Sequence, residues 1–202
     1  MEPLVQRWSA EYVEDGLLYR VAEPDEAALL AAAPLLSRWY NEPRNRALLT
    51  NEQDHSPAEV VEHYRSMRGA GARTFLFYRD GVLAGDGDLR AFAVHDDGPE
   101  AEYALLVGEV GRQGRGLGTA FTRLVLHLSF GPLGLSRVFA SVIPGNRGSL
   151  RMFEKLGFVV DLTPAGRRYA EGEADVCLRL GAAEFARLHG ERLASARIAA
   201  SP

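Results

Sequence analysis

The sequence predicts a single α/β domain in which helices cover a mixed central sheet. Residues 103–107 form a nearly uninterrupted apolar run, which is typical of a strand buried on both faces. The glycine-rich segment 113–118 follows, and apolar residues then recur at spacings of three and four from Leu117 to Leu128, which indicates an amphipathic helix. The 202 residues, 47% of them hydrophobic, are enough for one sizeable core.

The first third of the chain is predicted to contain one strand and two helices. Residues 17–23 are typical of a strand, and residues 24–39 favour a helix because a proline and two acidic residues open its first turn. Ser56-Pro57-Ala58-Glu59 combines an N-cap, an early proline and a capping-box glutamate, so a second helix is predicted over residues 56–67. We expect residues 40–56 to be a loop.

A hairpin and further strands are predicted next. Asp80-Gly81 is a turn sequence between residues 74–78 and a second strand running from Val82 to about Val94. The polar turn 95–99 then leads into the strand that carries Glu102 and the apolar run.

The last third is predicted to supply the remaining strands and helices. Residues 138–142 and the alternating segment 175–180 are strand-like, and Cys177 within the latter is expected to be a small buried residue. Residues 182–200, rich in Ala, Leu, Arg and Glu, favour a C-terminal helix, although the same composition suits a frayed tail.

The segment Gln113-Gly114-Arg115-Gly116-Leu117-Gly118 suits the binding of a pyrophosphate. Alternating glycines let the backbone approach a ligand, and the N–H groups that open the following helix have no intrahelical partner. A dinucleotide fingerprint is excluded because Thr119 or Phe121 occupies the required sixth glycine position, and a P-loop is excluded because no Lys follows Gly116. A turn that only connects a strand to a helix is the alternative.

Two motifs resemble those of one family. Gln113-x-x-Gly116-x-Gly118 is similar to the Q/R-x-x-G-x-G/A signature of the GNAT superfamily of N-acetyltransferases, and residues 146–158 are similar to its N-x-x-S-x-x-x-F/Y-x-K-x-G-F block. The resemblance covers residues 17–180 and is strongest to the branch that acetylates ribosomal-protein N-termini and other small amines. Residues 1–16 are then an N-terminal extension, and residues 181–202 are a C-terminal helix or tail.

The resemblance implies the GNAT fold, a mixed, mostly antiparallel central sheet covered by helices on both faces. It also implies transfer of an acetyl group from acetyl-CoA to a primary amine, on a peptide N-terminus or a small molecule, by direct attack in a ternary complex. Two alternatives stay open: a non-catalytic acyl-CoA-binding regulatory module, and an acyltransferase that uses a larger donor such as succinyl-CoA.

The resemblance also implies a set of donor-binding residues. Backbone groups near Leu105, Leu106 and Val107 would pair with the pantetheine arm as an added strand. The amides of the following loop and helix start would meet the pyrophosphate, with Arg112 and Arg115 as supplementary charges; the residues concerned are Gln113, Gly114, Arg115, Gly116, Leu117, Gly118 and Thr119. Asn146 would hold the ligand or order its turn, and Phe153 would pack against the CoA arm or the core. Val107 lies six residues before Gln113 instead of the family's usual five, so a bulge or an extra loop residue is expected at residues 108–112.

Catalytic roles follow from the same resemblance. Glu102 is the expected general base, acting directly or through a water, and Glu109 is a second, lower-ranked candidate. Ser149 is the expected hydroxyl donor to the leaving thiolate, because Phe153 occupies the position at which the family commonly has a tyrosine and cannot donate a proton.

Selection of the acceptor is expected in the segments that flank the cleft, residues 39–54 and 95–100. Their acidic residues could receive a cationic amine. The candidates, for which ordinary solvation in a loop is the alternative, are Glu42, Glu52 and Asp54.

Composition argues against other classes of protein. The net charge of −4 and the absence of a Lys/Arg run do not favour nucleic-acid binding. The five histidines lack the spacing of a zinc site, so no metal is expected. No signal peptide or membrane-length apolar stretch is present, and the chain has one cysteine, so we expect a cytoplasmic protein without membrane contact. The family resemblance also makes a homodimer plausible.

Overall fold

The computed structural model describes residues 6–49, 53–108, 111, 113–170 and 172–202, which form nine strands and seven helices. The strands are β1 (Arg7–Glu14), β2 (Leu17–Ala22), β3 (Arg73–Arg79), β4 (Val82–His95), β5 (Gly98–Val107), β6 (Arg137–Val142), β7 (Val159–Val160), β8 (Val176–Gly181) and β9 (Arg197–Ser201). The helices are α1 (Glu26–Asn41), α2 (Pro43–Leu49), α3 (Pro57–Gly69), α4 (Leu117–Phe130), α5 (Arg147–Lys155), α6 (Pro164–Arg167) and α7 (Ala182–His189).

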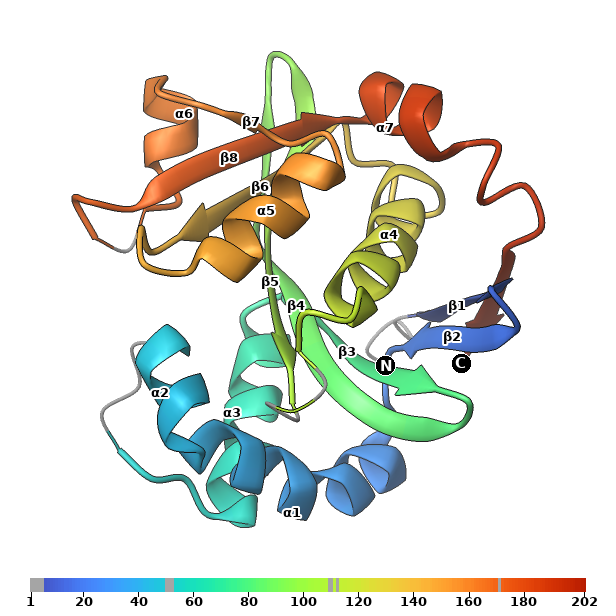
Figure 1. Cartoon of the computed structure of the whole chain (residues 1–202), viewed down its shortest axis with the longest axis vertical. Helices are drawn as coiled ribbons and strands as arrows, with labels where there is room; N and C mark the ends of the chain where they lie inside the picture. Colours follow the sequence, from blue (N-terminus) through green and yellow to red (C-terminus); the bar gives the residue numbers. More distant parts are fainter. Residues whose placement is uncertain (1–5, 50–52, 109–110, 112, 171) are drawn as a thin grey trace.

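The strands form one sheet in the order β7-β8-β6-β5-β4-β3-β2-β1-β9. Neighbouring strands are antiparallel except β5 and β6, which run parallel and pair only through residues 100–102 of β5 and 137–139 of β6. Beyond that point β5 stays with β4 and β6 stays with β8, so the two strands separate (Figure 1). The sheet therefore opens in its middle, where part of β5 has no strand on one side.

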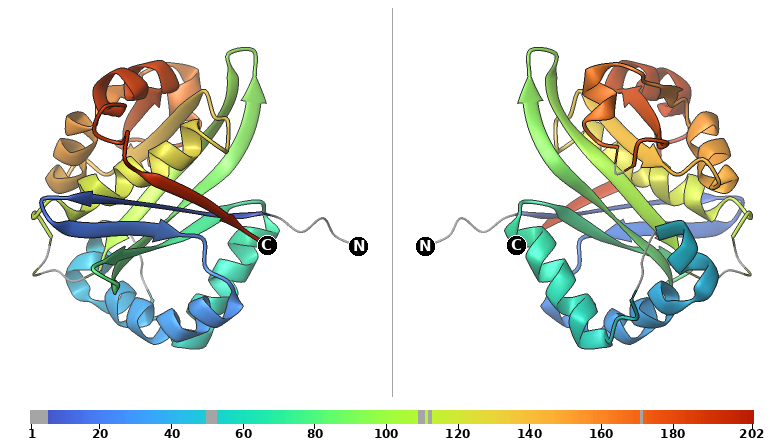
Figure 2. Two further views of the ribbon diagram at one scale, coloured as in Figure 1. Left: turned by 90° about the vertical axis from the view of Figure 1, so that its right-hand side faces the viewer. Right: turned by 90° about the vertical axis from the view of Figure 1, so that its left-hand side faces the viewer.

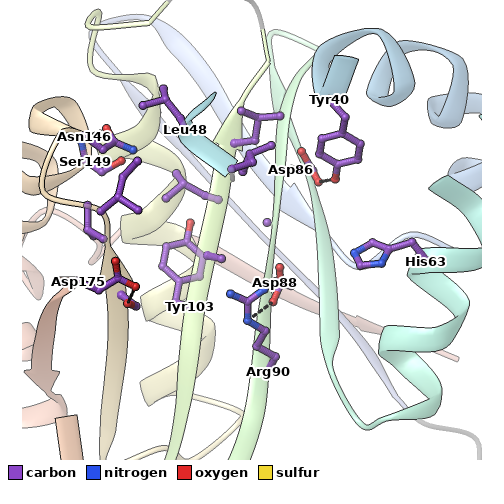
Figure 3. A pocket seen from close by; sticks show the side chains of 18 of the residues that line it. Tyr40, Leu48, His63, Asp86, Asp88, Arg90, Tyr103, Asn146, Ser149 and Asp175 are labelled. Atoms are coloured by element: carbon purple, nitrogen blue, oxygen red, sulfur yellow. Dashed lines mark hydrogen bonds and ion pairs between the residues drawn. The ribbon is translucent and has the colours of Figure 1, made fainter. Parts of the chain in front are cut away.

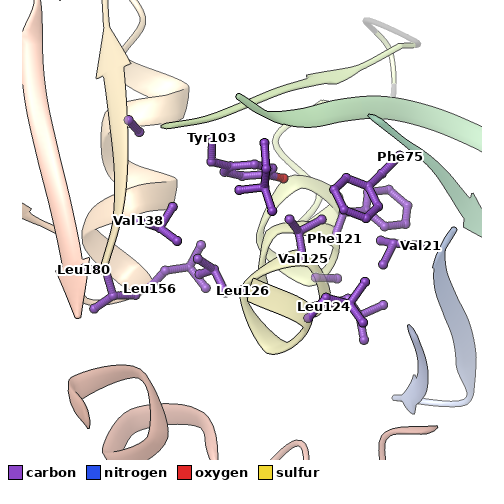
Figure 4. Packing of buried hydrophobic residues seen from close by; sticks show 14 of the residues in the cluster. Val21, Phe75, Tyr103, Phe121, Leu124, Val125, Leu126, Val138, Leu156 and Leu180 are labelled. Carbon is purple, nitrogen blue, oxygen red and sulfur yellow. The ribbon is translucent and has the colours of Figure 1, made fainter. Parts of the chain in front are cut away.

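Helices cover both faces of the sheet, as expected, and each face has its own hydrophobic core (Figure 2). On one face α4 packs against the sheet, and Figure 4 shows its Phe121 beside Phe75 of β3. The ring of Phe121 is stacked on that of Phe77. On the other face α1 and α3 pack over Leu76 and Leu106. Alternation along β5 explains the division, because Tyr103 belongs to the first core and Leu106 to the second.

Several local predictions are confirmed by the hydrogen bonds that start each element. The carboxylate of Asp25 accepts the N–H of Ala28 at 2.7 Å and caps α1. Ser56 and Glu59 form the predicted capping box at the start of α3. In the turn between β3 and β4, Asp80 and Gly81 both have positive φ, 51° and 76°, as a two-residue hairpin turn requires.

The prediction of a loop over residues 40–56 was wrong in part. Helix α1 continues to Asn41, and α2 follows at once from Pro43. The carboxylate of Glu42 accepts the N–H of Asn45 at 3.0 Å, and the side chain of Asn45 makes three hydrogen bonds outside α2, two of them buried. A helix of seven residues is marginal by itself, so these tertiary contacts explain why the sequence pattern did not indicate it.

Both ends of the chain contain strands that the sequence did not predict. Residues 7–14, expected to be an extension, form β1, which pairs with β2 on one side and with β9 on the other. The expected C-terminal helix ends at His189, and residues 197–201 form the edge strand β9. Hydrogen bonding to β1 places these residues in a strand that their helix-favouring composition did not predict.

Within the described ranges, no helix is both long and apolar enough to cross a membrane.

Candidate active site

The opening between β5 and β6 contains a cavity of about 360 Å³ beside the start of α4. Its walls come from the end of β5, the first turn of α4, the start of α5 and the end of α2. The residues predicted from sequence that line it are Leu105, Leu106, Val107, Gln113, Gly114, Gly116, Leu117, Gly118, Thr119, Asn146 and Ser149. The structure therefore brings together three segments that are separated in the sequence.

Gly116 determines how α4 begins. It is the N-cap residue, with φ of 85°, and its lack of a side chain means that no side-chain oxygen caps the helix. The N–H groups of Leu117, Gly118 and Thr119 precede the first intrahelical bond, which runs from the N–H of Ala120 to the carbonyl of Gly116. This helix start offers uncapped amides and the positive end of a dipole, which suit an anion.

Gly118 lets the start of α4 lie close to α5. A Cβ at this position would lie 2.8 Å from Sδ of Met152, which is closer than side-chain atoms approach without moving. Only glycine lets α4 and α5 approach each other this closely without displacing Met152. A cradle formed by backbone groups fits a pyrophosphate linked to an extended, amide-rich arm, as coenzyme A has.

Asn45 connects α2 to the loop that precedes α4. It is fully buried, and its Nδ2 donates to the carbonyl oxygens of Trp39 and Gly108 at 3.0 and 2.9 Å. Its Oδ1 accepts from Nε2 of Gln113 at 2.9 Å, and the same Nε2 donates to the carbonyl of Val107. The side chain of Gln113 therefore fixes the wall of the cavity. The expected bulge or extra residue at 108–112 falls largely outside the described residues, because 109, 110 and 112 are among those not described.

Helix α5 supplies the opposite wall. Oδ1 of Asn146 accepts the N–H of Ser149 at 3.1 Å, so Asn146 caps α5 and orders its turn. The ring of Phe153 is buried and packs edge-to-face with Tyr103 and Phe158. Phe153 thus belongs to the core, although it also contributes to the wall of the neighbouring cavity.

A second cavity of about 430 Å³ continues from the first on the side of α1 and α3 (Figure 3). The two cavities share wall residues, which are Leu48, Leu49, Leu105, Leu106, Asn146 and Ser149. Among the described residues of the second cavity, the acidic ones outnumber the arginines: Glu59, Asp86, Asp88 and Asp175 face one arginine, Arg90. This excess of carboxylates gives the second cavity a field that attracts cations.

Asp86 is the most buried carboxylate of this cavity, with 5% of its surface exposed. The hydroxyl groups of Tyr40, from α1, and Tyr64, from α3, both donate to its Oδ2, the latter at 2.6 Å. Burial raises the pKa of Asp86 to about 6, and the two hydroxyl groups counteract part of this effect. Burial likewise lowers the pKa of His63 on α3, which keeps that imidazole neutral near pH 7.

The structure places Glu102 and Arg115 outside both cavities. Glu102 lies across the β4–β5 pair from Arg90, whose Nε donates to Oε2 of Glu102 at 2.9 Å. Arg115 is exposed to solvent. The other candidates Glu109, Arg112 and Glu52 lie outside the described residues.

Of the two segments expected to select the acceptor, residues 39–54 and 95–100, only the first contributes to a cavity wall. Within residues 39–54, Tyr40, Leu48 and Leu49 line the second cavity, whereas Glu42 caps α2 and Asp54 pairs with Arg46. The segment 95–100 does not line either cavity. The carboxylate of Glu100 is fully buried and bonded to Arg137 at 2.7 Å and to Tyr169 at 2.8 Å.

Sequence reasoning missed Asp86, Tyr40 and Tyr64. A signal for the first was present in Gly85-Asp86-Gly87-Asp88, since glycines inside a strand mark a close approach of backbones. A Cβ at Gly85 or Gly87 would lie within 2.6 Å of a carbonyl oxygen of β5. No local pattern connects the two tyrosines to Asp86, because each comes from a different helix. Among the described residues, no group of three or more His, Cys, Asp or Glu could hold a metal ion.

Fold and site together define an α/β domain whose sheet opens beside a glycine-capped helix start. A model of the acetyltransferase (GNAT) domain matches residues 17–159, and the chain belongs to this family. The resemblance predicted from the two motifs and the predicted fold class are thereby confirmed.

The individual relatives match this chain either over a short segment or at low sequence identity. Mycothiol acetyltransferase from Mycobacteroides abscessus is 43% identical over 72 residues, which is 35% of this chain and only about a quarter (24%) of that protein. The structure of RimJ from Mycobacterium smegmatis in complex with CoA-disulfide has a TM-score of 0.70 at 18% identity and covers 88% of both chains. The aminoglycoside acetyltransferase AAC(6')-Ib in complex with coenzyme A has a TM-score of 0.64 at 19% identity, covering 78% of this chain and 94% of that one. At these identities the two structures establish likeness of fold.

Proposed function

We propose that this protein is an acyl-CoA-dependent N-acetyltransferase that transfers an acetyl group from acetyl-CoA to a primary amine, by direct attack in a ternary complex. The observation that carries the proposal is the junction of the two cavities at Leu105, Leu106 and Ser149. One cavity suits a pyrophosphate and an extended amide chain, and the other suits a cation. Two substrates bound there would meet at the junction, and their proximity supplies much of the catalysis that direct transfer needs.

The donor would be held mainly by backbone groups. The part of β5 beyond Glu102 has no strand on the side of β6, so a pantetheine arm can add there as a strand. The uncapped amides of Leu117, Gly118 and Thr119 would receive the pyrophosphate. Support from Arg115 requires its exposed side chain to turn toward the ligand.

In the reaction, the amine nitrogen attacks the thioester carbonyl carbon, a C–N bond forms and the C–S bond breaks. The amine loses two protons, and the CoA thiolate takes up one. Ser149 lies at the junction of the cavities and is our candidate for the hydroxyl that donates to the thiolate. Glu102 as the general base stays a prediction, and its ion pair with Arg90 would have to open for it to act on the amine directly.

The acceptor class is supported by charge. A cavity rich in carboxylates favours a cationic amine over an alcohol or an acid. Peptide N-termini, aminoglycosides, polyamines and small metabolite amines all meet this requirement, so an acceptor panel has to include each of them.

The experiment is calorimetric titration with acetyl-CoA, followed in the same sample by measurement of free-thiol release with the amine panel. Binding together with amine-dependent thiol release is the expected result. Binding without release from any amine would favour the regulatory module, for which the absence of a hydroxyl at Phe153 is the specific observation. Faster release from succinyl-CoA than from acetyl-CoA and propionyl-CoA would favour the larger donor, and absence of binding would overturn the proposal.

A further inference from the structure

Only one of the two carboxylate oxygens of Asp86 accepts hydrogen bonds. Both tyrosine hydroxyls donate to Oδ2, whereas Oδ1 is buried and has no hydrogen-bond partner in the described part of the chain. A buried carboxylate oxygen without a donor is costly, and such atoms occur where a ligand supplies the missing donor. Asp86 lines the second cavity, but Oδ1 is itself buried, so a ligand in that cavity contacts Oδ1 only after the side chains around it shift.

Asp86 also lies close to the place where the two substrates would meet. Its partner across the β4–β5 pair is Leu106, which lines both cavities. Gly85 and Gly87 flank Asp86 and let β5 approach β4 at this point, because a Cβ at either position would clash with a carbonyl oxygen of β5. In Figure 3 the carboxylate of Asp86 lies beside Tyr40, between the α1–α3 side and β5.

Other charged groups face the same cavity. Asp88 and Arg90 follow Asp86 at alternate positions of β4, so their side chains are on the same face of the sheet, and Nε of Arg90 lies 3.8 Å from Oδ1 of Asp88. Helix α3 contributes Glu59 and His63, while His55 precedes it and Asp175 precedes β8. Arg90 already pairs with two carboxylates, those of Asp88 and Glu102. The negative charge of Asp86 can therefore be balanced by a cation that enters the cavity.

The raised pKa of Asp86, about 6, suits proton transfer from an ammonium group. An ammonium with a pKa of about 8 gives its proton to such a carboxyl with an equilibrium constant of about 10⁻², compared with about 10⁻⁴ for a carboxyl of ordinary pKa. At pH 7 to 8 the carboxyl is still mainly ionised and can bind the ammonium. The tyrosine hydroxyls preserve this state, because hydrogen bonds to the ionised form lower the pKa.

We propose that Asp86 is the catalytic residue that receives the ammonium group of the acceptor and takes its proton, and that Tyr40 and Tyr64 are positioning residues that hold its carboxylate. This role rests on the proposed acetyl transfer. Oδ1 takes one N–H proton, and the amine nitrogen then attacks the thioester carbonyl carbon of the acyl-CoA. As the C–N bond forms and the C–S bond breaks, the second amine proton passes to the CoA thiolate through the hydroxyl of Ser149, and Asp86 then gives its proton to solvent.

The test compares Asp86→Asn with the wild type in acetyl-CoA titration and in thiol release from pH 5.5 to 9, with the best amine of the panel. We expect the acetyl-CoA Kd to stay within about twofold and kcat/KM to fall by at least about 100-fold, which is the usual effect of losing a general base. The wild type should show an acidic limb with an apparent pKa near 6, and this limb should be absent from the residual activity of Asp86→Asn.

The matched control is Glu23→Gln. Glu23 is also a buried carboxylate whose pKa is raised by burial, but it lines neither cavity and accepts the N–H of Trp8 at 2.9 Å. Glu23→Gln should retain the wild-type rate and pH profile. Tyr64→Phe is a second test, which keeps a carboxyl at position 86 and removes one of its donors; the acidic limb should move upward by up to about one pH unit.

The outcomes separate the two proposals. If Asp86→Asn turns over as fast as the wild type, and the acidic limb of Tyr64→Phe stays at its wild-type position, the role of Asp86 is overturned. The proposed acetyl transfer would still stand. A larger loss of kcat/KM in Glu102→Gln than in Asp86→Asn would return the base to Glu102. If the wild type binds acetyl-CoA but releases no thiol with any amine, the proposed function fails and the role of Asp86 fails with it.

Discussion

The substitution Asn45→Ala should destabilise the fold and weaken acetyl-CoA binding, because Asn45 connects α2 to both ends of the loop that precedes α4. Its buried side chain makes three hydrogen bonds, to the carbonyls of Trp39 and Gly108 and from Nε2 of Gln113. These bonds join residues 39–45 to residues 108–113, two regions that are far apart in the sequence. The prediction therefore tests the arrangement of the donor site itself.

The expected loss of folding free energy follows from the hydrogen bonds that the partners of Asn45 lose. The carbonyl of Trp39 keeps the N–H of Glu42, and Nε2 of Gln113 keeps the carbonyl of Val107. The buried carbonyl of Gly108 keeps no other partner among the described residues. A buried acceptor left unsatisfied costs about 1–3 kcal/mol, and each of the other two bonds contributes about 1 kcal/mol. We expect a loss of roughly 3–5 kcal/mol, equivalent to a fall in Tm of roughly 6–20 °C for a chain of this size.

The assay is urea unfolding followed by circular dichroism on Asn45→Ala, Gln113→Ala and the double variant. Gln113→Ala should cost only about 1–2 kcal/mol, because the side chain of Gln113 makes one bond to Asn45 and one to the carbonyl of Val107, and it is partly exposed. The double variant should lose less than the sum of the two, with a coupling of at least about 0.5 kcal/mol. Acetyl-CoA should bind more weakly to all three variants. A loss below about 1 kcal/mol in Asn45→Ala, or strictly additive effects, would refute the reasoning.

Three further predictions test single features of the site. Gly116→Ala should raise the acetyl-CoA Kd about tenfold, because φ of 85° costs a non-glycine residue roughly 1–2 kcal/mol. The control Gly69→Ala changes an open position without positive φ and should bind acetyl-CoA as the wild type does. Equal acetyl-CoA binding by the two variants would contradict this prediction. Ser149→Ala should lower kcat about tenfold without changing the acetyl-CoA Kd, and a change in the Kd alone would assign Ser149 to binding. Because the folded pKa of Asp86 is raised, the wild type should lose stability as the pH rises from about 4 through 6, whereas Asp86→Asn should lack this loss. The shift of about two units corresponds to about 3 kcal/mol, and parallel stability curves over this range would argue against a buried, ionisable Asp86.

The segments that line the first cavity could be predicted from the sequence because their features are local. Gly114 and Gly116 have positive φ at their own positions, and the strand, turn and helix of this region are consecutive. Asn146 likewise caps the helix that it begins. Such features depend on neighbours within a few residues, so a motif can specify them.

The family, the order of most elements and the glycine-capped start of α4 were therefore determined by the sequence alone. Only the tertiary structure decided the second cavity, where Tyr40 of α1 and Tyr64 of α3 meet Asp86 of β4. It also decided that Glu102 pairs with Arg90, that α2 forms around the buried Asn45, and that the last residues form a strand beside β1. Burial and hydrogen bonding between different segments create these features, and no periodicity or spacing within one segment encodes a partner that lies in another segment.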